Sequence, residues 1–150
     1  MTDGKARQPF GRRDDYRHFT AITTRWLDND VYGHINNVVY YAFFDTVVNR
    51  YLIEGGFLDL ENSDTIGLVV ETGCRYARPL AFPESVTGAL RVAHLGTSSV
   101  RYEVGLFRGD DDSVAAEGYF VHVYVDRETR RPRPLPEALK QLLEPLRTGE

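Results

Sequence analysis

The chain has 150 residues, 42% of them hydrophobic and 27% charged, which predicts one soluble globular domain with a buried core. Its net charge of −4 argues against nucleic-acid binding, and no apolar run reaches the roughly 18 to 20 residues that span a bilayer. The N-terminal segment lacks the apolar core of a signal peptide, so we expect a cytoplasmic protein without a membrane partner. The single cysteine, Cys74, excludes an internal disulfide and a cysteine-based metal site.

The first predicted elements are a flexible lead-in and a strand. Residues 1–17 mix acidic and basic side chains, and we expect them to precede a single domain over residues 18–147. Residues 18–26 alternate between two faces and are rich in β-branched and aromatic side chains, which predicts a strand. A motif crowded with polar residues, 28–36, then interrupts this pattern.

Residues 37–54 are predicted to form a long helix. The run is too long for a typical strand, Asn36 or Asn37 suits the N-cap, and Gly55 with Gly56 suits the C-terminal end. The first two turns are apolar on every side, which predicts a buried helix.

Four further strands and a terminal helix follow. Proline- and glycine-rich turns separate them, and the short connections predict antiparallel neighbours for the last three strands. The predicted strands are 65–78, 83–96, 98–108 and 113–126, and the predicted helix is 134–147, broken by Pro145. We expect an α+β fold whose sheet curls around the long helix, with a partner subunit closing the side that the sheet leaves open.

The polar motif before the long helix is the candidate reaction centre. A helix N-terminus carries unpaired N–H groups and a partial positive charge, so it stabilises a developing oxyanion. An acidic side chain in the motif adds the second part needed for attack on a carbonyl. Gly33 allows the backbone to approach a ligand closely or to adopt a positive φ.

Structural roles for the same residues stay open at this stage. Asp28 and Asp30 can cap turns, and His34 and Asn36 can be satisfied structural groups. Cys74 lies in a predicted strand, where a cysteine is more often part of the core than a nucleophile.

A metal site is a further alternative. Its ligands would be Asp28, Asp30 and His34 with His94 or His122. A calcium loop does not fit, because Tyr32 and Val39 stand where oxygen ligands are needed. The sequence contains no glycine-rich phosphate loop and no G-x-S-x-G elbow. We therefore expect no metal and no cofactor.

The run Asp28-x-Asp30-x-x-Gly33-His34-x-Asn36-Asn37-x-x-Tyr40 resembles the hotdog-fold thioesterases of the 4-hydroxybenzoyl-CoA thioesterase-like family. Residues 74–84 and 123–139 resemble two strands of that family and their exits, and the resemblance covers about residues 18–140. It implies a five-stranded antiparallel sheet wrapped around a central helix, hydrolysis of acyl-CoA thioesters, and a homodimer or homotetramer. The G-H-x-N-N run implies a fatty or branched acyl group rather than an aromatic one.

The resemblance also assigns roles to individual residues. Asp30 takes the place of the catalytic carboxylate, as general base or nucleophile, and the backbone N–H of Asn37 takes the place of the oxyanion donor. We expect His34 and Asn36 to order the loop or a water, His34 being a candidate proton shuttle, while Asp28 shapes the loop.

Substrate contacts are expected from aromatic and basic residues. The candidate acyl contacts are Gly33, Tyr40, Tyr41, Phe44 and Tyr76, although aromatic residues at helical spacing are also typical of a core. The candidate contacts to the phosphates and nucleotide of coenzyme A are Arg78, Arg101, Arg127, Arg130, Arg131, Ser98 and Ser99, and Glu71 is a candidate supporting acid. Two other functions remain open: a thioesterase acting on acyl-carrier protein, and a non-catalytic module that binds acyl-CoA.

Overall fold

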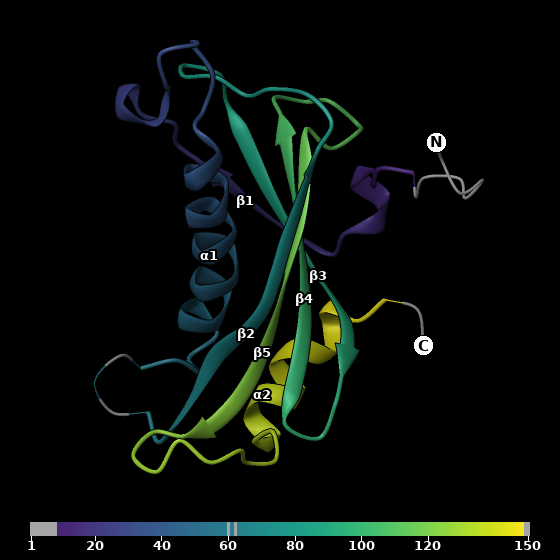
Figure 1. Ribbon diagram of the computed structural model, residues 1–150. Coiled ribbons are helices and arrows are strands. Elements are labelled where there is room, and N and C mark those ends of the chain that lie inside the picture. Colours follow the sequence, from purple (N-terminus) through teal and green to yellow (C-terminus); the bar gives the residue numbers. More distant parts are fainter. Residues whose placement is uncertain (1–8, 60, 62, 149–150) are drawn as a thin grey trace, which may run out of the picture.

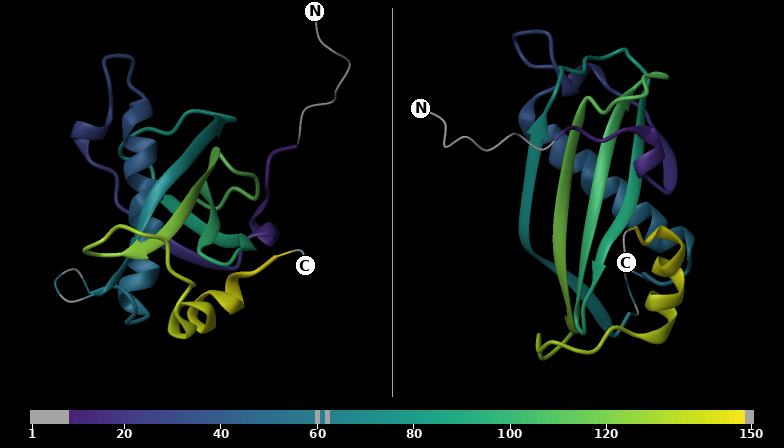
Figure 2. Two further views of the ribbon diagram at one scale, coloured as in Figure 1. Left: turned by 60° about the horizontal axis from the view of Figure 1, so that its bottom comes forward. Right: turned by 90° about the vertical axis from the view of Figure 1, so that its right-hand side faces the viewer.

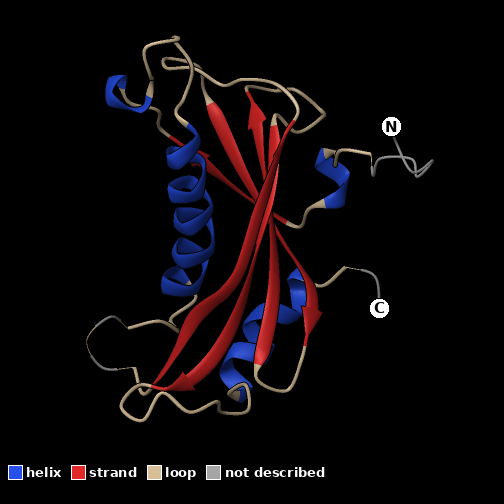
Figure 3. Ribbon diagram, in the orientation of Figure 1, coloured by secondary structure: helices blue, strands red, loops and turns tan. Residues whose placement is uncertain are grey.

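The computed structural model describes residues 9–59, 61 and 63–148, and it has one antiparallel sheet with a long helix along one face (Figures 1 and 3). The sheet has five strands in the order β1-β3-β4-β5-β2. The strands are β1 (His18–Ile22), β2 (Thr65–Tyr76), β3 (Val86–Leu95), β4 (Ser99–Arg108) and β5 (Ala116–Asp126), and the helices are α1 (Asn37–Glu54) and α2 (Glu137–Leu143). All five predicted strands and both helices are confirmed, with shorter bounds than predicted for every element except α1.

The C-terminal segment changes its helix type at the predicted proline. α2 ends at Leu143, and a 3₁₀ turn, Glu144–Leu146, contains Pro145. In the described part of the chain, no helix is long and apolar enough to cross a membrane.

α1 packs one face against the sheet (Figure 2). The Oδ1 atom of Asn36 accepts a hydrogen bond from the N–H of Val38 at 3.0 Å and so caps the first turn. Phe44 and Val48 are fully buried against the strands, whereas Asp45 and Val38 are exposed, Val38 by 76%. The sheet of one chain therefore covers only one side of the helix and leaves the other side open, as the sequence analysis expects of a single chain.

Two glycines allow this close packing. Gly88 on β3 and Gly118 on β5 face the helix, and a Cβ at either position would overlap the side chains of Val47 and Phe44, respectively. The strands therefore provide space for the helix at the points where its bulky side chains meet them.

The segment before β1 packs on the sheet face opposite to α1 (Figure 1). Tyr16 is buried, and its ring lies edge-on to Phe107 at 5.8 Å. The guanidinium of Arg13 lies 4.7 Å from the centre of the Phe107 ring and donates to the carbonyl of Gly109 at 2.6 Å. The prediction of a loose lead-in is thus wrong for residues 9–17, while residues 1–8 lie outside the described residues.

β2 is an edge strand with exposed apolar side chains. Among the described residues it pairs only with β5, and the pairing shifts register between Val69 and Glu71. Val69, Val70 and Tyr76 are exposed by 47%, 61% and 43%. An unprotected edge of this kind is a template for pairing with another chain.

The core contains one buried imidazole without a hydrogen-bond partner. His122 on β5 is only 5% exposed, and within the described structure neither of its ring nitrogens has a partner. The rings of Tyr102 and Phe120 lie 5.0 and 5.8 Å away. Burial of this ring lowers the pKa of His122 from 6.5 to about 4, because the charged form loses its hydration.

We predict that His122→Leu makes the protein less sensitive to acid. With its pKa lowered to about 4, the folded protein binds this proton less readily than the unfolded chain. The stability that depends on neutral His122 is therefore complete above about pH 6.5 and is lost as the pH falls toward about 4. Urea unfolding at pH 7 and pH 5 should show that the wild type loses about 2 kcal/mol more than the variant.

His94, which is exposed near the end of β3, supplies the matched control. His94→Leu should keep the acid-dependent loss of the wild type. Equal losses in the wild type and in His122→Leu would contradict the prediction.

Candidate active site

A tight loop carries the polar motif at the N-terminus of α1. The N–H of Asp30 donates to the carbonyl of His34 at 2.8 Å, and the N–H of Gly33 donates to the carbonyl of Asp30 at 3.0 Å. Gly33 has a φ of 82°, a backbone conformation that favours glycine. A positive φ is one of the two reasons for a glycine that the sequence analysis gave at this position. The loop therefore folds back on itself and holds Asp30 just ahead of the helix.

Asp28 holds the start of this loop. It is fully buried at the end of a 3₁₀ turn, Trp26–Asp28. Its Oδ2 atom accepts from the N–H of Arg25 at 2.8 Å, and its Oδ1 atom accepts from the guanidinium of Arg25 at 3.0 Å. Its carbonyl accepts from the N–H of Asn36 at 2.8 Å. These contacts agree with the structural role predicted for Asp28.

Asn29 fastens the loop to the turn before β3, a role that the sequence analysis missed. Its Oδ1 atom accepts from the N–H of Phe82 at 2.9 Å. Nearby, the N–H of Ile35 donates to the carbonyl of Leu80 at 2.7 Å, and the N–H of Leu80 donates to the hydroxyl of Tyr40 at 3.3 Å. Asn29 lies between two acids in the sequence, and only its tertiary partner distinguishes it from an ordinary turn residue.

Two polar atoms at this helix end have no hydrogen-bond partner among the described residues. The half-buried Asp30 accepts through Oδ1 from the N–H groups of Tyr32 at 2.8 Å and His34 at 3.5 Å. Within the described residues, its Oδ2 atom accepts no hydrogen bond and the N–H of Asn37 donates none. The other N–H groups of the first turn are occupied, since Val38 donates to the Asn36 side chain and Val39 to the Asn36 carbonyl.

His34 and Asn36 differ in how firmly they are held. The imidazole of His34 is exposed, and within the described structure it has no hydrogen-bond partner. The side-chain oxygen of Asn36 is occupied by the cap to Val38 at 3.0 Å. His34 is thus open to a water or a ligand, whereas Asn36 fixes the geometry of the helix end.

The predicted acyl contacts divide into core and surface residues. Tyr40 and Phe44 are buried, whereas Tyr41 is half-buried and Tyr76 is 43% exposed. The rings of Tyr40 and Tyr76 meet edge-on at 4.9 Å. Burial is the main cause of the raised pKa of Tyr40, and the charge of Asp30 adds to it.

Cys74 on β2 lies half-buried against the same core. Burial raises the pKa of its thiol, so the reactive thiolate is disfavoured. This agrees with the structural role expected from the sequence.

The five predicted arginine contacts to coenzyme A differ in whether their side chains already have a protein partner. Arg78 pairs with Asp111 at 3.4 Å, Arg101 pairs with Glu103 at 2.9 Å, and Arg127 donates to the carbonyl of Glu61 at 3.0 Å. In contrast, Arg130 and Arg131 are exposed, and their guanidinium groups have no hydrogen bond or ion pair within the described residues. These two are the cations open to a phosphate among the five predicted.

Several predicted contacts lie far from the loop within one chain. Ser98 and Ser99 lie in and beside the β3–β4 turn, and Arg130 and Arg131 follow β5. Figure 1 shows both regions at the end of the sheet opposite to the N-terminus of α1. One chain therefore does not bring these residues to Asp30.

Glu71 is held by the neighbouring strand rather than by the loop. Its Oε2 atom accepts from the hydroxyl of Tyr119 on β5 at 2.7 Å. This hydrogen bond directs one carboxylate oxygen of Glu71 to the neighbouring strand. The structure of one chain therefore does not support Glu71 as an acid that assists Asp30.

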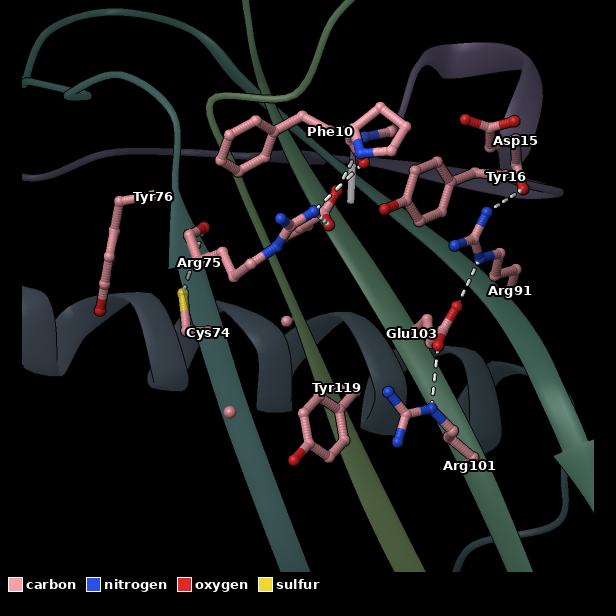
Figure 4. A pocket seen from close by; sticks show the side chains of 15 residues that line it. Phe10, Asp15, Tyr16, Cys74, Arg75, Tyr76, Arg91, Arg101, Glu103 and Tyr119 are labelled. Atoms are coloured by element: carbon pink, nitrogen blue, oxygen red, sulfur yellow. Dashed lines mark hydrogen bonds and ion pairs between the residues drawn. The ribbon is translucent and has the colours of Figure 1, made fainter. Parts of the chain in front are cut away.

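A cavity of about 1130 Å³ lies on the sheet face opposite to α1 (Figure 4). Its charged lining residues are Asp15, Arg75, Arg91, Arg101, Glu103 and Glu117. Burial raises the pKa of Glu103, but the hydrogen bonds and charges of Arg101 and Arg91 outweigh it, so the pKa lies below its ordinary value. Arg75 similarly pairs with Glu117 at 2.5 Å. Since each guanidinium already holds a carboxylate, this cavity is poorly suited to the phosphates of coenzyme A.

The metal alternative is not supported. Within the described residues, no group of three histidine, cysteine or acidic side chains is arranged to hold a metal ion. His94 is exposed near the end of β3 and His122 is buried on β5, so neither joins Asp28, Asp30 and His34.

The antiparallel sheet with its helix, and the loop ahead of that helix, define the hotdog class of thioesterase-like proteins. The chain belongs to the Thioesterase-like superfamily, which it matches over residues 24–143. It is similar to the PA5185 protein of Pseudomonas aeruginosa strain PAO1, with 51% identity, a TM-score of 0.91, and coverage of 94% of this chain and 99% of that one. The predicted fold and family are therefore confirmed.

Two further relatives are informative. A thioesterase of Thermus thermophilus, solved in complex with coenzyme A and Zn, is 29% identical, with a TM-score of 0.72 and coverage of 89% of this chain and 96% of that one. The uncharacterized protein YsmA of Bacillus subtilis strain 168 is 25% identical over 88 residues, which is 59% of each chain. The match thus spans about three fifths of the length of this curated relative.

We predict that Asp28→Ala destabilises the fold by about 2 kcal/mol, because it removes the buried acceptor of the Arg25 N–H and guanidinium. Urea unfolding measures the loss. Asp14→Ala, at an exposed carboxylate in the segment before β1, is the control and should change stability by less than about 0.5 kcal/mol. Equal effects of the two substitutions would contradict a structural role for Asp28.

Proposed function

We propose that this protein hydrolyses acyl-CoA thioesters to a free acid and coenzyme A. In this proposal Asp30 is the catalytic carboxylate and the N–H of Asn37 is the oxyanion donor. The observation that carries the proposal is the pair of unused groups at one helix end, Asp30 Oδ2 and the Asn37 N–H, among the described residues. Family membership and the relative bound to coenzyme A support this substrate class.

The chemistry needs few groups because the thioester is reactive. A thiolate leaves without strong acid assistance, so one carboxylate can replace a nucleophile–histidine–acid triad. As a general base, Asp30 would take a proton from the attacking water and return it to the departing thiolate. As a nucleophile, it would form an acyl anhydride that water then opens. Both routes use the free oxygen of Asp30, and both build negative charge that the Asn37 N–H and the helix dipole stabilise.

His34 and the predicted aromatic contacts support the same site. The exposed imidazole of His34 follows Asp30 in the loop and can order the attacking water or carry a proton. Tyr41 and Tyr76 keep partly open surface near the helix N-terminus, where they can contact the acyl group. We assign Asn36 to holding the loop and the helix start in register.

Asp30→Asn should abolish most of the activity. We expect the wild type to release thiol from fatty or branched acyl-CoAs, and the variant to lose about 10²-fold or more in kcat, because an amide neither accepts the proton nor attacks the carbonyl. The measurement is thiol release over a panel of short, medium, long, branched and aromatic acyl-CoAs.

Asp14→Asn is the matched control, and circular dichroism and unfolding should show that both variants fold. Full activity in Asp30→Asn would remove Asp30 from the mechanism. If the wild type binds acyl-CoA but releases no thiol from any substrate, the protein is a non-catalytic binding module and the proposal fails.

We infer that two copies of the chain pair through β2 and complete each site. The edge of this strand is unpaired within the described chain, and its exposed Val69 and Val70 would be covered by a second copy. In antiparallel self-pairing, the start of one β2 lies beside the end of the other. This pairing would bring the opposite end of the second copy, with its free Arg130 and Arg131, toward the Asp30 loop of the first. The β3–β4 turn, with Ser98 and Ser99 in and beside it, lies at that same end (Figure 1).

The double substitution Arg130→Glu and Arg131→Glu tests this arrangement. We expect kcat/KM for an acyl-CoA to fall about tenfold, while kcat/KM for the matching acyl N-acetylcysteamine thioester, which has no phosphates, stays unchanged. Lys140→Glu on α2 is the control for a charge reversal elsewhere on the surface, and equilibrium sedimentation reports the dimer. A monomeric active enzyme, or equal losses on both substrates, would contradict the shared site.

A protein-bound thioester is a second candidate substrate. The segment around Asp30 exposes Trp26, Leu27, Val31 and Tyr32 by 74%, 80%, 93% and 82%. Such a patch is typical of an interaction surface. Hydrolysis of an acyl-carrier protein at a kcat/KM at least tenfold above that of the same acyl-CoA would favour this candidate. In either case we place the reaction in the cytoplasm, as the sequence predicts.

A further inference from the structure

The loop of residues 29–34, which carries Asp30, makes few side-chain contacts with the rest of the protein. Val31 and Tyr32 at its tip are exposed by 93% and 82%. Within the described structure, the carboxylate of Asp30 accepts hydrogen bonds only from N–H groups of this same loop. Among the described residues of the loop, Asn29 is the only one whose side chain forms a hydrogen bond to a residue outside it.

Two contacts attach the loop to a single turn, residues 80–84, before β3. At the exit of the loop, the N–H of Ile35 donates to the carbonyl of Leu80 at 2.7 Å. At its entry, the side-chain Oδ1 atom of Asn29 accepts from the N–H of Phe82 at 2.9 Å, and its Nδ2 atom donates to the carbonyl of the same residue at 3.5 Å. Held at its exit alone, the loop can pivot, and the second contact at its entry fixes its orientation.

The turn that receives Asn29 is itself fixed to α1. Leu80 is fully buried, and its N–H donates to the hydroxyl of Tyr40 at 3.3 Å. Tyr40 lies about one helical turn after Asn37, whose N–H is the proposed oxyanion donor. The turn therefore connects the helix that carries the donor with the loop that carries Asp30, and the side chain of Asn29 closes this connection.

We propose that Asn29 is a positioning residue for thioester hydrolysis, because its hydrogen bonds to the Phe82 backbone hold Asp30 in place relative to the N–H of Asn37. This inference rests on the proposed thioesterase function and adds to it a residue that contacts no substrate. Misplacing a catalytic group by about 1 Å costs on the order of 10²-fold in rate, so a pivoting loop lowers kcat. Substrate affinity changes little, since Phe82 occupies both polar atoms of the Asn29 side chain.

The test is the kinetics of Asn29→Ala at pH 8, measured as thiol release from the acyl-CoA that the wild type hydrolyses fastest. We expect kcat to fall at least tenfold and KM to stay within about twofold, because the lost contact acts on the transition state. Asn29→Asp keeps an acceptor in the place of Oδ1, and at pH 8 both this carboxylate and Asp30 are ionised. It should therefore restore kcat to within about threefold of the wild type.

Thr24→Val is the matched control. The hydroxyl of Thr24 donates to the carbonyl of Glu84 in the same turn at 3.1 Å, but Thr24 lies outside the Asp30 loop. This variant loses the same kind of hydrogen bond to the same turn, so urea unfolding should show a loss of stability similar to that of Asn29→Ala. Its kcat should stay within about twofold of the wild type, since the orientation of the loop is unchanged.

The outcomes separate this inference from the proposed function. An unchanged kcat in Asn29→Ala, an equal loss in Thr24→Val, or no recovery in Asn29→Asp would overturn the inference and leave the thioesterase intact. If Asn29→Ala does not fold, Asn29→Ser replaces it with the same expected loss, because the serine oxygen lies one bond closer to the backbone and does not reach Phe82.

If no acyl-CoA is hydrolysed, the proposed function fails, and amide hydrogen exchange still decides whether Asn29 fixes the loop. The N–H of Ile35 reports on the contact at the loop exit. Its exchange at least tenfold faster in Asn29→Ala, but not in Thr24→Val, supports the inference. Equal exchange in the wild type and Asn29→Ala overturns it.

Discussion

The N-terminus of α1 places the strongest constraint on this protein. A helix begins with N–H groups that have no acceptor inside the helix, and here they lie next to a loop at the edge of the sheet. Asn36 occupies the N–H groups of Val38 and Val39 with its side chain and its carbonyl. The donor that remains belongs to Asn37, and the loop that provides the cap also positions Asp30. The same loop therefore both caps the helix and forms the candidate site.

The one-sided packing of α1 has effects beyond the helix. Because five strands cover only one face, the other face and the edge of β2 stay open in a single chain. The segment after β5, with Arg130 and Arg131, and the β3–β4 turn, with Ser98, lie at the end of the sheet opposite to the N-terminus of α1 (Figure 1). The same topology thus explains both the open apolar edge and the separation of the predicted substrate contacts, and a second copy would resolve both.

The sequence predicts the elements well because each has a local cause. The cap at Asn36, the glycines after α1 and the alternation along the strands are all visible without a structure. The motif likewise predicts Gly33 and the structural role of Asp28. The anchoring of Asn29 to Phe82 and the unpaired state of His122 depend on residues 53 positions away and on a neighbouring strand, respectively, so no local pattern encodes them. The packing of residues 9–17 was missed for the same reason, since Tyr16 is buried by a strand some 90 residues later in the chain.

The glycines under α1 also restrict how this sequence can change. Phe44 occupies the space that a side chain at Gly118 would need, and Val47 does the same over Gly88. The effects of substitutions at such facing positions are not independent, because a larger residue on the strand becomes acceptable only with a smaller one on the helix. Homologous chains should therefore vary at 44 and 118 together, because helix and sheet keep their combined volume only when both positions change.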